Sequence, residues 1–183
     1  MTTANISFCL IQVLHLDKLE YQGGQTLLYS NLSRLMANNA NAVRLRELII
    51  DKKVPVFKAG LSKNLLEVFW PVLKPLNGFQ RRAVLKALIC EDYCLINGLP
   101  GTGKTSLIVA LIRLAVLLKQ SVLLTSYTHS AVDNVLLKLC QFDDVEFVRI
   151  GREHRTHPSI LPYSAEVKTQ NCHTVEDLEK VYR

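Results

Sequence analysis

The stretch of sequence that decides the fold is Gly98-Leu99-Pro100-Gly101-Thr102-Gly103-Lys104-Thr105. It matches the phosphate-binding pattern G-x-x-x-x-G-K-[ST] at every fixed position. Glycines let the backbone curl tightly, so that successive N–H groups point at phosphate oxygens, and the helix that follows adds the positive end of its dipole. In this pattern Lys104 reaches the β- and γ-phosphates and the Thr105 hydroxyl holds Mg²⁺. The sequence therefore predicts a nucleotide phosphate site.

The segments that flank this loop occur in the order that a phosphate-binding loop requires. Residues 93–97 form a short apolar run suited to a buried parallel strand, and residues 106–118 are apolar nearly all round, as in a packed helix. A second strand (121–125), a helix (130–141) and a third strand (145–150) are predicted to follow. This β-α-β-α-β order implies a parallel sheet with right-handed crossovers. We therefore expect an α/β fold of the P-loop NTPase type.

The chain before the nucleotide-binding unit is predicted to form a helical arm. Apolar positions predict a helix over residues 30–50, interrupted by a polar break in its middle, and a short helix over residues 62–69. Residues 71–75 begin and end with proline and are predicted to act as a hinge. Two further helices are expected over residues 77–89 and 173–182. The predicted domains are the arm, residues 1–75, and the nucleotide-binding unit, residues 76–183.

The composition indicates a folded intracellular protein. Hydrophobic residues make up 49% of the 183, enough for a sizeable core, and the net charge of +6 favours polyanionic partners. No Asp or Glu occurs from Tyr93 through Val132, which avoids repulsion of a phosphate ligand, although burial accounts for most of this stretch. Five widely spaced cysteines predict neither disulfides nor a zinc site. We expect a soluble protein without a membrane segment.

Gln80 lies eighteen positions before Gly98 and has two interpretations. A glutamine amide upstream of a phosphate-binding loop can pair with the N6 and N7 edge of adenine, as amides do in DNA recognition. If Asn77 is the N-cap of the following helix, however, Gln80 falls at the N3 position and can close a capping box. The residues themselves favour neither role, and both remain open.

Residues 125–134 follow the second predicted strand and are rich in hydroxyl groups. Hydroxyls, a histidine and the start of a helix at the carboxyl edge of a sheet suit contact with a phosphodiester backbone. Tyr127 and His129 have side chains that can also stack on a base. The alternative is a polar loop in which Thr128 only caps the helix, and taken alone the residues slightly favour that alternative.

These motifs together resemble those of superfamily 1 helicases of the 5′→3′ subgroup. Leu76-Asn77-x-x-Gln80 is similar to their Q motif, residues 98–105 to motif I and residues 125–134 to motif Ia. Within motif Ia, the string SYTHSAVDN at residues 126–134 resembles the eukaryotic DNA replication ATP-dependent helicase/nuclease family in particular. Residues 46–51 also look like the helical stalk before that family's motor. The resemblance implies the N-terminal part of a motor region, with an incomplete RecA-like sheet after a helical arm.

The resemblance also implies a role for each motif. Lys104 and Thr105 would serve catalysis, Thr105 would hold Mg²⁺, and Gln80 would contact adenine. The implied nucleotide-binding residues are Gln80, Gly98, Pro100, Gly101, Thr102, Gly103, Lys104 and Thr105. The implied contacts with single-stranded DNA come from Ser126, Tyr127, Thr128, His129 and Ser130. Expected cofactors are ATP and Mg²⁺, with no iron–sulfur cluster in this chain. The implied location is nuclear, with mitochondria as a second compartment, and the implied partners include replication and repair proteins.

One element of a P-loop ATPase has no candidate in this sequence. Such an enzyme needs a carboxylate at the end of a second strand, where it holds Mg²⁺ and polarises the attacking water. Asp143-Asp144 precedes its predicted strand, and Glu176-Asp177 follows no apolar run. No second motor lobe fits within this length either. We therefore expect the chain to bind ATP but not to hydrolyse it or unwind DNA as it stands.

Two other function classes compete with a helicase segment. One is a non-catalytic nucleotide-binding module that engages a protein partner through the arm. The other is a sister superfamily 1 helicase that acts on RNA. Nucleotide binding without turnover would favour the first, and a competition between DNA and RNA would test the second.

Overall fold

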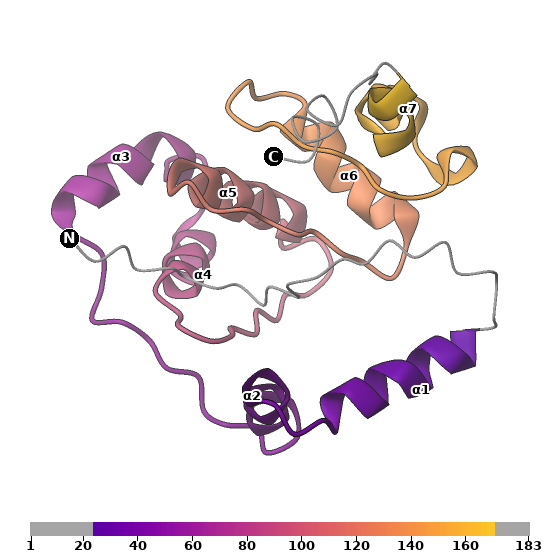
Figure 1. Cartoon of the computed structure of the whole chain (residues 1–183). Helices are drawn as coiled ribbons and strands as arrows, with labels where there is room; N and C mark the ends of the chain where they lie inside the picture. Colours follow the sequence, from indigo (N-terminus) through magenta and orange to yellow (C-terminus); the bar gives the residue numbers. More distant parts are fainter. Residues whose placement is uncertain (1–23, 171–183) are drawn as a thin grey trace. The chain divides into compact units, whose positions relative to one another are not determined.

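A computed structural model of the chain describes residues 24–170, which form two compact units (Figure 1). One unit contains the described residues up to Lys58 together with Cys90–Cys94, and the other contains Ala59–Ile89 together with the described residues from Leu95 onward. Within residues 24–170, no helix is both long and apolar enough to cross a membrane.

The first unit is built on α1 (Gly24–Leu35) and α2 (Ala40–Ile49), which contact each other. The polar break predicted within residues 30–50 separates them, because the Asn39 side chain caps α2. Arg46 on α2 donates to the Leu35 carbonyl at the end of α1, at 2.6 Å. A capping side chain and one arginine therefore fix the corner between these two helices.

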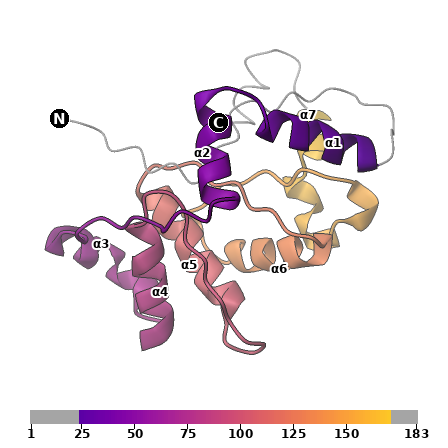
Figure 2. The same cartoon turned by 90° about the horizontal axis from the view of Figure 1, so that it is seen from below.

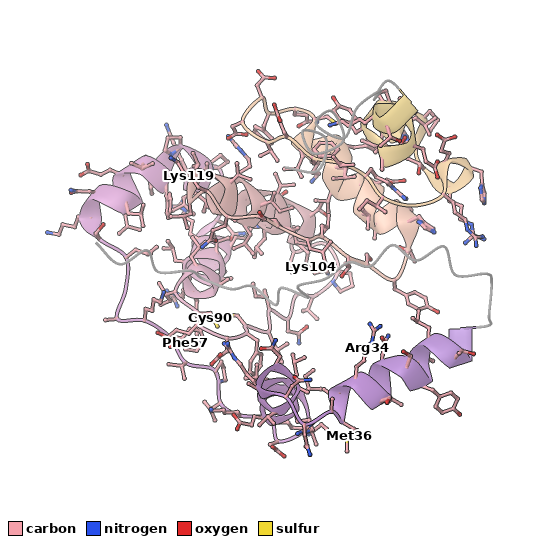
Figure 3. All side chains as sticks on the ribbon, viewed as in Figure 1. Arg34, Met36, Phe57, Cys90, Lys104 and Lys119 are labelled. Carbon is pink, nitrogen blue, oxygen red and sulfur yellow. The ribbon has the colours of Figure 1, made fainter. Side chains whose placement is uncertain are left out.

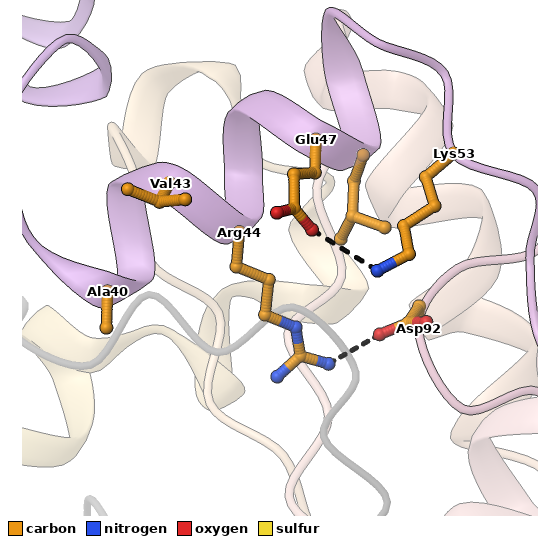
Figure 4. Close-up of a pocket in the computed structure, with 7 residues that line it drawn as sticks. Ala40, Val43, Arg44, Glu47, Lys53 and Asp92 are labelled. Atoms are coloured by element: carbon orange, nitrogen blue, oxygen red, sulfur yellow. Dashed lines mark hydrogen bonds and ion pairs between the residues drawn. The ribbon is translucent and has the colours of Figure 1, made fainter.

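Residues 90–94 join this first unit through a backbone bridge and side-chain hydrogen bonds. Phe57 and Cys90 form an isolated antiparallel bridge (Figure 3), and the Tyr93 hydroxyl donates to the Lys53 carbonyl at 2.7 Å. The unit also holds an open pocket of about 420 Å³ (Figure 4). Its charged side chains pair with one another at 2.6 Å (Arg44–Asp92) and 3.2 Å (Lys53–Glu47). Because these charges are already paired, the pocket has no excess charge to attract a ligand.

The second unit contains a core formed by α3 (Lys63–Leu73), α4 (Gly78–Leu88) and α5 (Lys104–Leu117). Helix α5 contacts both α3 and α4, as Figure 1 shows. The buried residues of this core are Phe69, Val72, Leu73, Leu76, Val84, Leu88, Leu107, Ala110 and Leu114. The helix predicted over residues 106–118 is therefore confirmed, and its apolar character reflects burial on more than one side.

The predicted hinge at residues 71–75 is wrong in its first half. Pro71 lies inside α3, which continues to Leu73. A proline at this position removes one backbone hydrogen bond, which would otherwise reach the Glu67 carbonyl. Burial of Phe69 and Leu73, with 0% and 2% of their surface exposed, stabilises the last turn against this loss. Helix α3 packs with α4 and α5 in one core. The boundary between the two predicted domains at residue 75 stays a prediction.

A second core in the same unit lies between α5 and α6 (His129–Leu139). Its buried residues are Val109, Ile112, Val135, Leu136, Leu139 and Ile160. Two 3₁₀ segments, η1 (Glu153–Arg155) and η2 (Pro158–Tyr163), and a short helix α7 (Ala165–Gln170) complete the described chain. The sequence did not predict η1, η2 or α7, and the predicted helix over 173–182 lies outside the described residues.

The predicted parallel sheet is absent from the part of the chain that the structure describes. Residues 93–97, 121–125 and 145–150 form no strand ladder, and two isolated bridges are the only β pairing between residues 24 and 170. Figure 2 shows the chain running without a helix from the end of α5 to the start of α6. Parallel strands need partners on their edges and layers on both faces. Within the described chain, residues 93–97 and 121–125 pair with no other strand, and Leu95 and Leu123 are 86% and 62% exposed. In residues 145–150 the pairing is limited to one parallel bridge between Arg149 and Ser164.

Candidate functional site

The phosphate-binding loop leads into α5 through two glycines in the left-handed region. Gly101 has φ 78° and Gly103 has φ 79°, values that L side chains rarely adopt. Gly103 occupies the N-cap position of α5, and no acidic residue lies in the first turn of that helix. A Cβ at Gly98 would lie 2.9 Å from Cγ of Lys104. The glycines at positions 98, 101 and 103 are therefore required by close approach or by backbone conformation.

The exposed Lys104 side chain folds back onto the loop (Figure 3). Its Nζ donates to the carbonyl oxygens of Gly98 and Leu99, both at 2.9 Å. The Thr102 hydroxyl donates to the same Leu99 carbonyl at 2.8 Å. Both acceptors of the ammonium are neutral, whereas phosphate oxygens carry charge and form the stronger, charge-assisted hydrogen bond. The geometry therefore allows phosphates to displace the carbonyls as partners of Lys104.

Thr105 follows Lys104 in the first turn of α5 and is half-buried. Within residues 24–170, no group of three or more His, Cys, Asp or Glu side chains could hold a metal ion. In nucleotide complexes Mg²⁺ keeps several waters and takes phosphate oxygens rather than an all-protein cage. The Mg²⁺ role of Thr105 stays a prediction.

Gln80 forms the capping box and also contacts the phosphate-binding loop. Its Oε1 accepts from the Asn77 backbone N–H at 3.0 Å, while the Asn77 side chain accepts from the Gln80 N–H at 2.9 Å. Its Nε2 donates to the Thr102 carbonyl at 2.9 Å. A Cβ added at Gly103 would lie 2.5 Å from that same nitrogen. One amide therefore joins the start of α4 to the loop, and its adenine contact stays a prediction.

Replacing Gln80 with glutamate separates the two roles of this side chain. Glutamate also closes a capping box, so the free energy of unfolding should fall by only about 1 kcal/mol, the value of the lost hydrogen bond to the Thr102 carbonyl. Glutamate has no amide donor for the Thr102 carbonyl or for adenine, so ATP affinity should fall about 10-fold. Urea unfolding and titration with a fluorescent ATP analogue would measure these two quantities. Equal ATP affinity of Gln80→Glu and the wild type would reduce Gln80 to a helix cap.

The candidate DNA loop, residues 126–130, leads into the first turn of α6. Thr128 caps this helix, with its hydroxyl accepting from the Ala131 N–H at 3.3 Å. Helix capping was the alternative interpretation of this loop, and it explains the position of the Thr128 hydroxyl. The residues beside Thr128 can still contact a ligand. Tyr127 is fully exposed, as a side chain that stacks on a base must be. His129 is half-buried and contacts Arg149. The predicted DNA contacts of residues 126–130 stay predictions.

Arg149 and Asp133 are two residues of this region that sequence reasoning did not select as site residues. Their side chains are 3% and 4% exposed and form an ion pair at 3.2 Å. A charged residue within the apolar run at 145–150 was the available signal, because Arg is almost never buried unless it is paired. Its partner was not readable from the sequence, because the two residues lie sixteen positions apart.

Helix α6 extends from the candidate DNA loop to the first turn of α5. Near its far end, Lys138 donates from Nζ to the Ser106 hydroxyl at 3.3 Å. Eleven residues give α6 a length of roughly 16 Å. The structure therefore connects the two candidate sites through one helix.

The phosphate-binding loop and α6 lie in a part of the chain that is similar to a known protein family. Residues 75–181 match the family model of the AAA domain. The chain belongs to this family. The AAA domain is a P-loop NTPase fold, which supports the expected fold class, although the described residues of this family member contain no sheet.

Relatives of this AAA domain chain include long helicase/nucleases. The DNA replication ATP-dependent helicase/nuclease DNA2 of Mus musculus is 44% identical over 176 residues, which are 93% of this chain and 16% of that protein. That of Xenopus laevis is 43% identical over 93% of this chain and 17% of its own length. The helicase/nuclease JHS1 of Arabidopsis thaliana is 38% identical over 88% of this chain and 12% of its own length.

The predicted resemblance to the DNA replication helicase/nuclease family is thereby confirmed. The chain spans less than a fifth of the length of each of these three relatives. The similarity therefore identifies a part of the motor region, and it does not extend to the activities of the whole relatives.

Proposed function

We propose that this chain is the ATP-binding segment of a DNA helicase/nuclease that acts on single-stranded DNA in replication and repair, including flap processing and end resection. Residues 98–105 bind the phosphates of ATP, Thr105 holds Mg²⁺, and Gln80 contacts adenine. Residues 126–130 contact the DNA backbone. The proposed location is the nucleus, with mitochondria as a second compartment. Replication and repair proteins are the proposed partners.

The observation that carries this proposal is the convergence of Lys104 and Gln80 on one loop. Lys104 binds the loop at Gly98 and Leu99, while Gln80 binds it at Thr102. The two side chains thereby approach the loop from α5 and from α4. A nucleotide needs such an arrangement, because its phosphates and its base must be held by different groups.

The proposed activity of this chain is ATP binding without ATP hydrolysis. The sequence offers no carboxylate that follows a strand, and ATP hydrolysis by a P-loop enzyme depends on such a group. Hydrolysis and movement along DNA are accordingly proposed for an enzyme that also contains that strand and a second motor lobe. Closure of two lobes around ATP would then move the protein along single-stranded DNA.

Two titrations of the full 183-residue chain test the proposal. A fluorescent ATP analogue should bind with Mg²⁺ and much more weakly without it, since the metal neutralises phosphate charge. A labelled single-stranded thymidine oligonucleotide should bind with an affinity that falls as salt rises, because phosphate contacts release counterions. A uridine oligonucleotide that competes better than DNA would favour an RNA helicase. Sustained ATP hydrolysis stimulated by DNA and abolished in Lys104→Met would contradict binding without turnover.

A second candidate function is favoured by the exposed apolar side chains of the first unit. Leu28, Tyr29, Leu32 and Met36 are each more than half exposed and have the spacing of one side of α1. Such a cluster is typical of a surface that contacts another protein. A nucleotide-regulated module that binds a protein partner through α1 would bind the ATP analogue but not the oligonucleotide.

A further inference from the structure

The Arg149 guanidinium lies at the centre of a buried hydrogen-bond network at the start of α6. Nε donates to Asp133 Oδ1 at 3.2 Å, and Nη1 donates to the Ile150 carbonyl at 2.8 Å. Nη2 lies 3.1 Å from Nδ1 of His129. The buried Arg149 side chain therefore contacts the carboxylate of Asp133 on α6, the backbone carbonyl of its own neighbour Ile150, and His129, the first residue of α6.

The contact with His129 determines which nitrogen of its ring carries the proton. A guanidinium has five N–H donors and no acceptor. Nδ1 of His129 must therefore be the acceptor in this contact, and the ring proton lies on Nε2. A phosphodiester group offers only acceptors, so an Nε2–H donor is the form of histidine that suits it.

Two further features hold Arg149 in this position. The second carboxylate oxygen of Asp133, Oδ2, accepts from the His157 backbone N–H at 2.9 Å, so both oxygens of Asp133 have partners. Gly151 has φ 140°, and a Cβ added there would collide with Nη1 of Arg149. The absence of a side chain at Gly151 leaves the space that the guanidinium occupies.

We propose that Arg149 is a positioning residue for DNA binding: it holds His129 at the start of α6 in the Nε2–H form that donates to a phosphodiester oxygen. The DNA part of this inference rests on the proposed function. Asp133 holds the guanidinium in place, and Gly151 leaves room for it. Arg149 itself is buried and does not touch the DNA.

Two variants of the full chain separate this role from a purely structural one. Arg149→Lys keeps a positive charge beside Asp133 but lacks the planar fork that reaches several partners at once. The double variant Asp133→Leu/Arg149→Met removes both charges, a change that buried pairs tolerate well. Each should weaken binding of a single-stranded thymidine oligonucleotide about 3- to 10-fold, the value of one hydrogen bond, with ATP-analogue affinity unchanged.

A spectroscopic measurement tests the tautomer without DNA. At about pH 8, where an ordinary imidazole is neutral, ¹H–¹⁵N correlation spectra report which ring nitrogen is protonated. The His129 signal is assigned by its loss in His129→Gln. It should show the proton on Nε2 in the wild type and a mixture of both forms in Arg149→Lys and in the double variant.

The control variant is Arg82→Met, which removes the same charge from an exposed position on α4. It should change DNA affinity by less than about twofold, because exposed charges are screened by salt. A wild-type proton on Nδ1 would overturn the proposal. So would unchanged DNA affinity in Arg149→Lys and the double variant when His129→Ala, which removes the Nε2 donor, lowers it. Unchanged DNA affinity in His129→Ala would also overturn it, because His129 would then make no contact with DNA. A wild type that binds no DNA would overturn the proposed function instead, while the tautomer would still decide the contact between Arg149 and His129.

Discussion

Replacing Lys104 with methionine is expected to weaken ATP binding at least about 100-fold. The ammonium group now binds two loop carbonyls at 2.9 Å, and in the proposed complex it binds two phosphates instead. Each charge-assisted hydrogen bond contributes about 1.5–3 kcal/mol, so losing two costs about 3 kcal/mol or more. A factor of ten in affinity corresponds to about 1.4 kcal/mol, which gives the predicted loss. Methionine keeps most of the side chain's length, so packing along the loop changes little.

Titration of the fluorescent ATP analogue measures this loss. Lys119→Met is the matched control, since Lys119 is an exposed lysine just beyond the opposite end of α5 (Figure 3). Its affinity should remain within about twofold of the wild type because screened surface charges contribute little. If both variants lost affinity equally, net charge rather than the loop would explain binding.

Replacing Asp133 with leucine is expected to destabilise the second unit by about 3–5 kcal/mol. The change leaves the Arg149 guanidinium buried without its counter-charge, which is the costly way to break a buried ion pair. It also removes the acceptor of the His157 N–H, 2.9 Å from Asp133 Oδ2. For a chain of this length the midpoint of thermal unfolding should fall by about 10 °C. Urea unfolding followed by circular dichroism gives the free energy directly.

Two comparisons show whether the unpaired charge is the cause. Adding Arg149→Met to Asp133→Leu removes the remaining charge and should restore most of the lost stability. Asp144→Leu breaks the more exposed pair with Arg113, 2.7 Å apart, and should cost about 1 kcal/mol or less. A double variant as unstable as Asp133→Leu alone would show that the lost acceptor of the His157 N–H or the packing around the introduced leucine, rather than the charge on Arg149, sets the cost.

Helices α2 to α6 and the phosphate-binding loop were predictable from the sequence because their determinants are local. Asn77 and Thr128 cap α4 and α6, as their types and spacing indicated. A helix satisfies its backbone groups four residues away, so capping and periodicity are enough to place it. The glycines of the loop were readable for the same reason.

The strands and the buried network were not predictable because their determinants are distant in sequence. Residues 93–97 and 121–125 have the composition of buried strands, but a strand forms only when another segment pairs with it. The contact between Asp133 and Arg149 likewise depends on how α6 meets a segment sixteen residues further on. For Gln80 the residue pattern favoured neither of two roles, and the structure adds a third partner, the Thr102 carbonyl.

The way in which Lys104 is bound has a consequence for ligand selectivity. Because its ammonium is already satisfied by the Gly98 and Leu99 carbonyls, an incoming anion must outcompete both of them. A chloride ion offers one weak acceptor, whereas a nucleoside triphosphate offers many charged oxygens and also meets the N–H groups of the loop. We therefore expect the loop to select ligands by their binding free energy. Abundant small anions in the cell would bind too weakly to displace the two carbonyls, whereas the polyphosphate of a nucleotide would displace them.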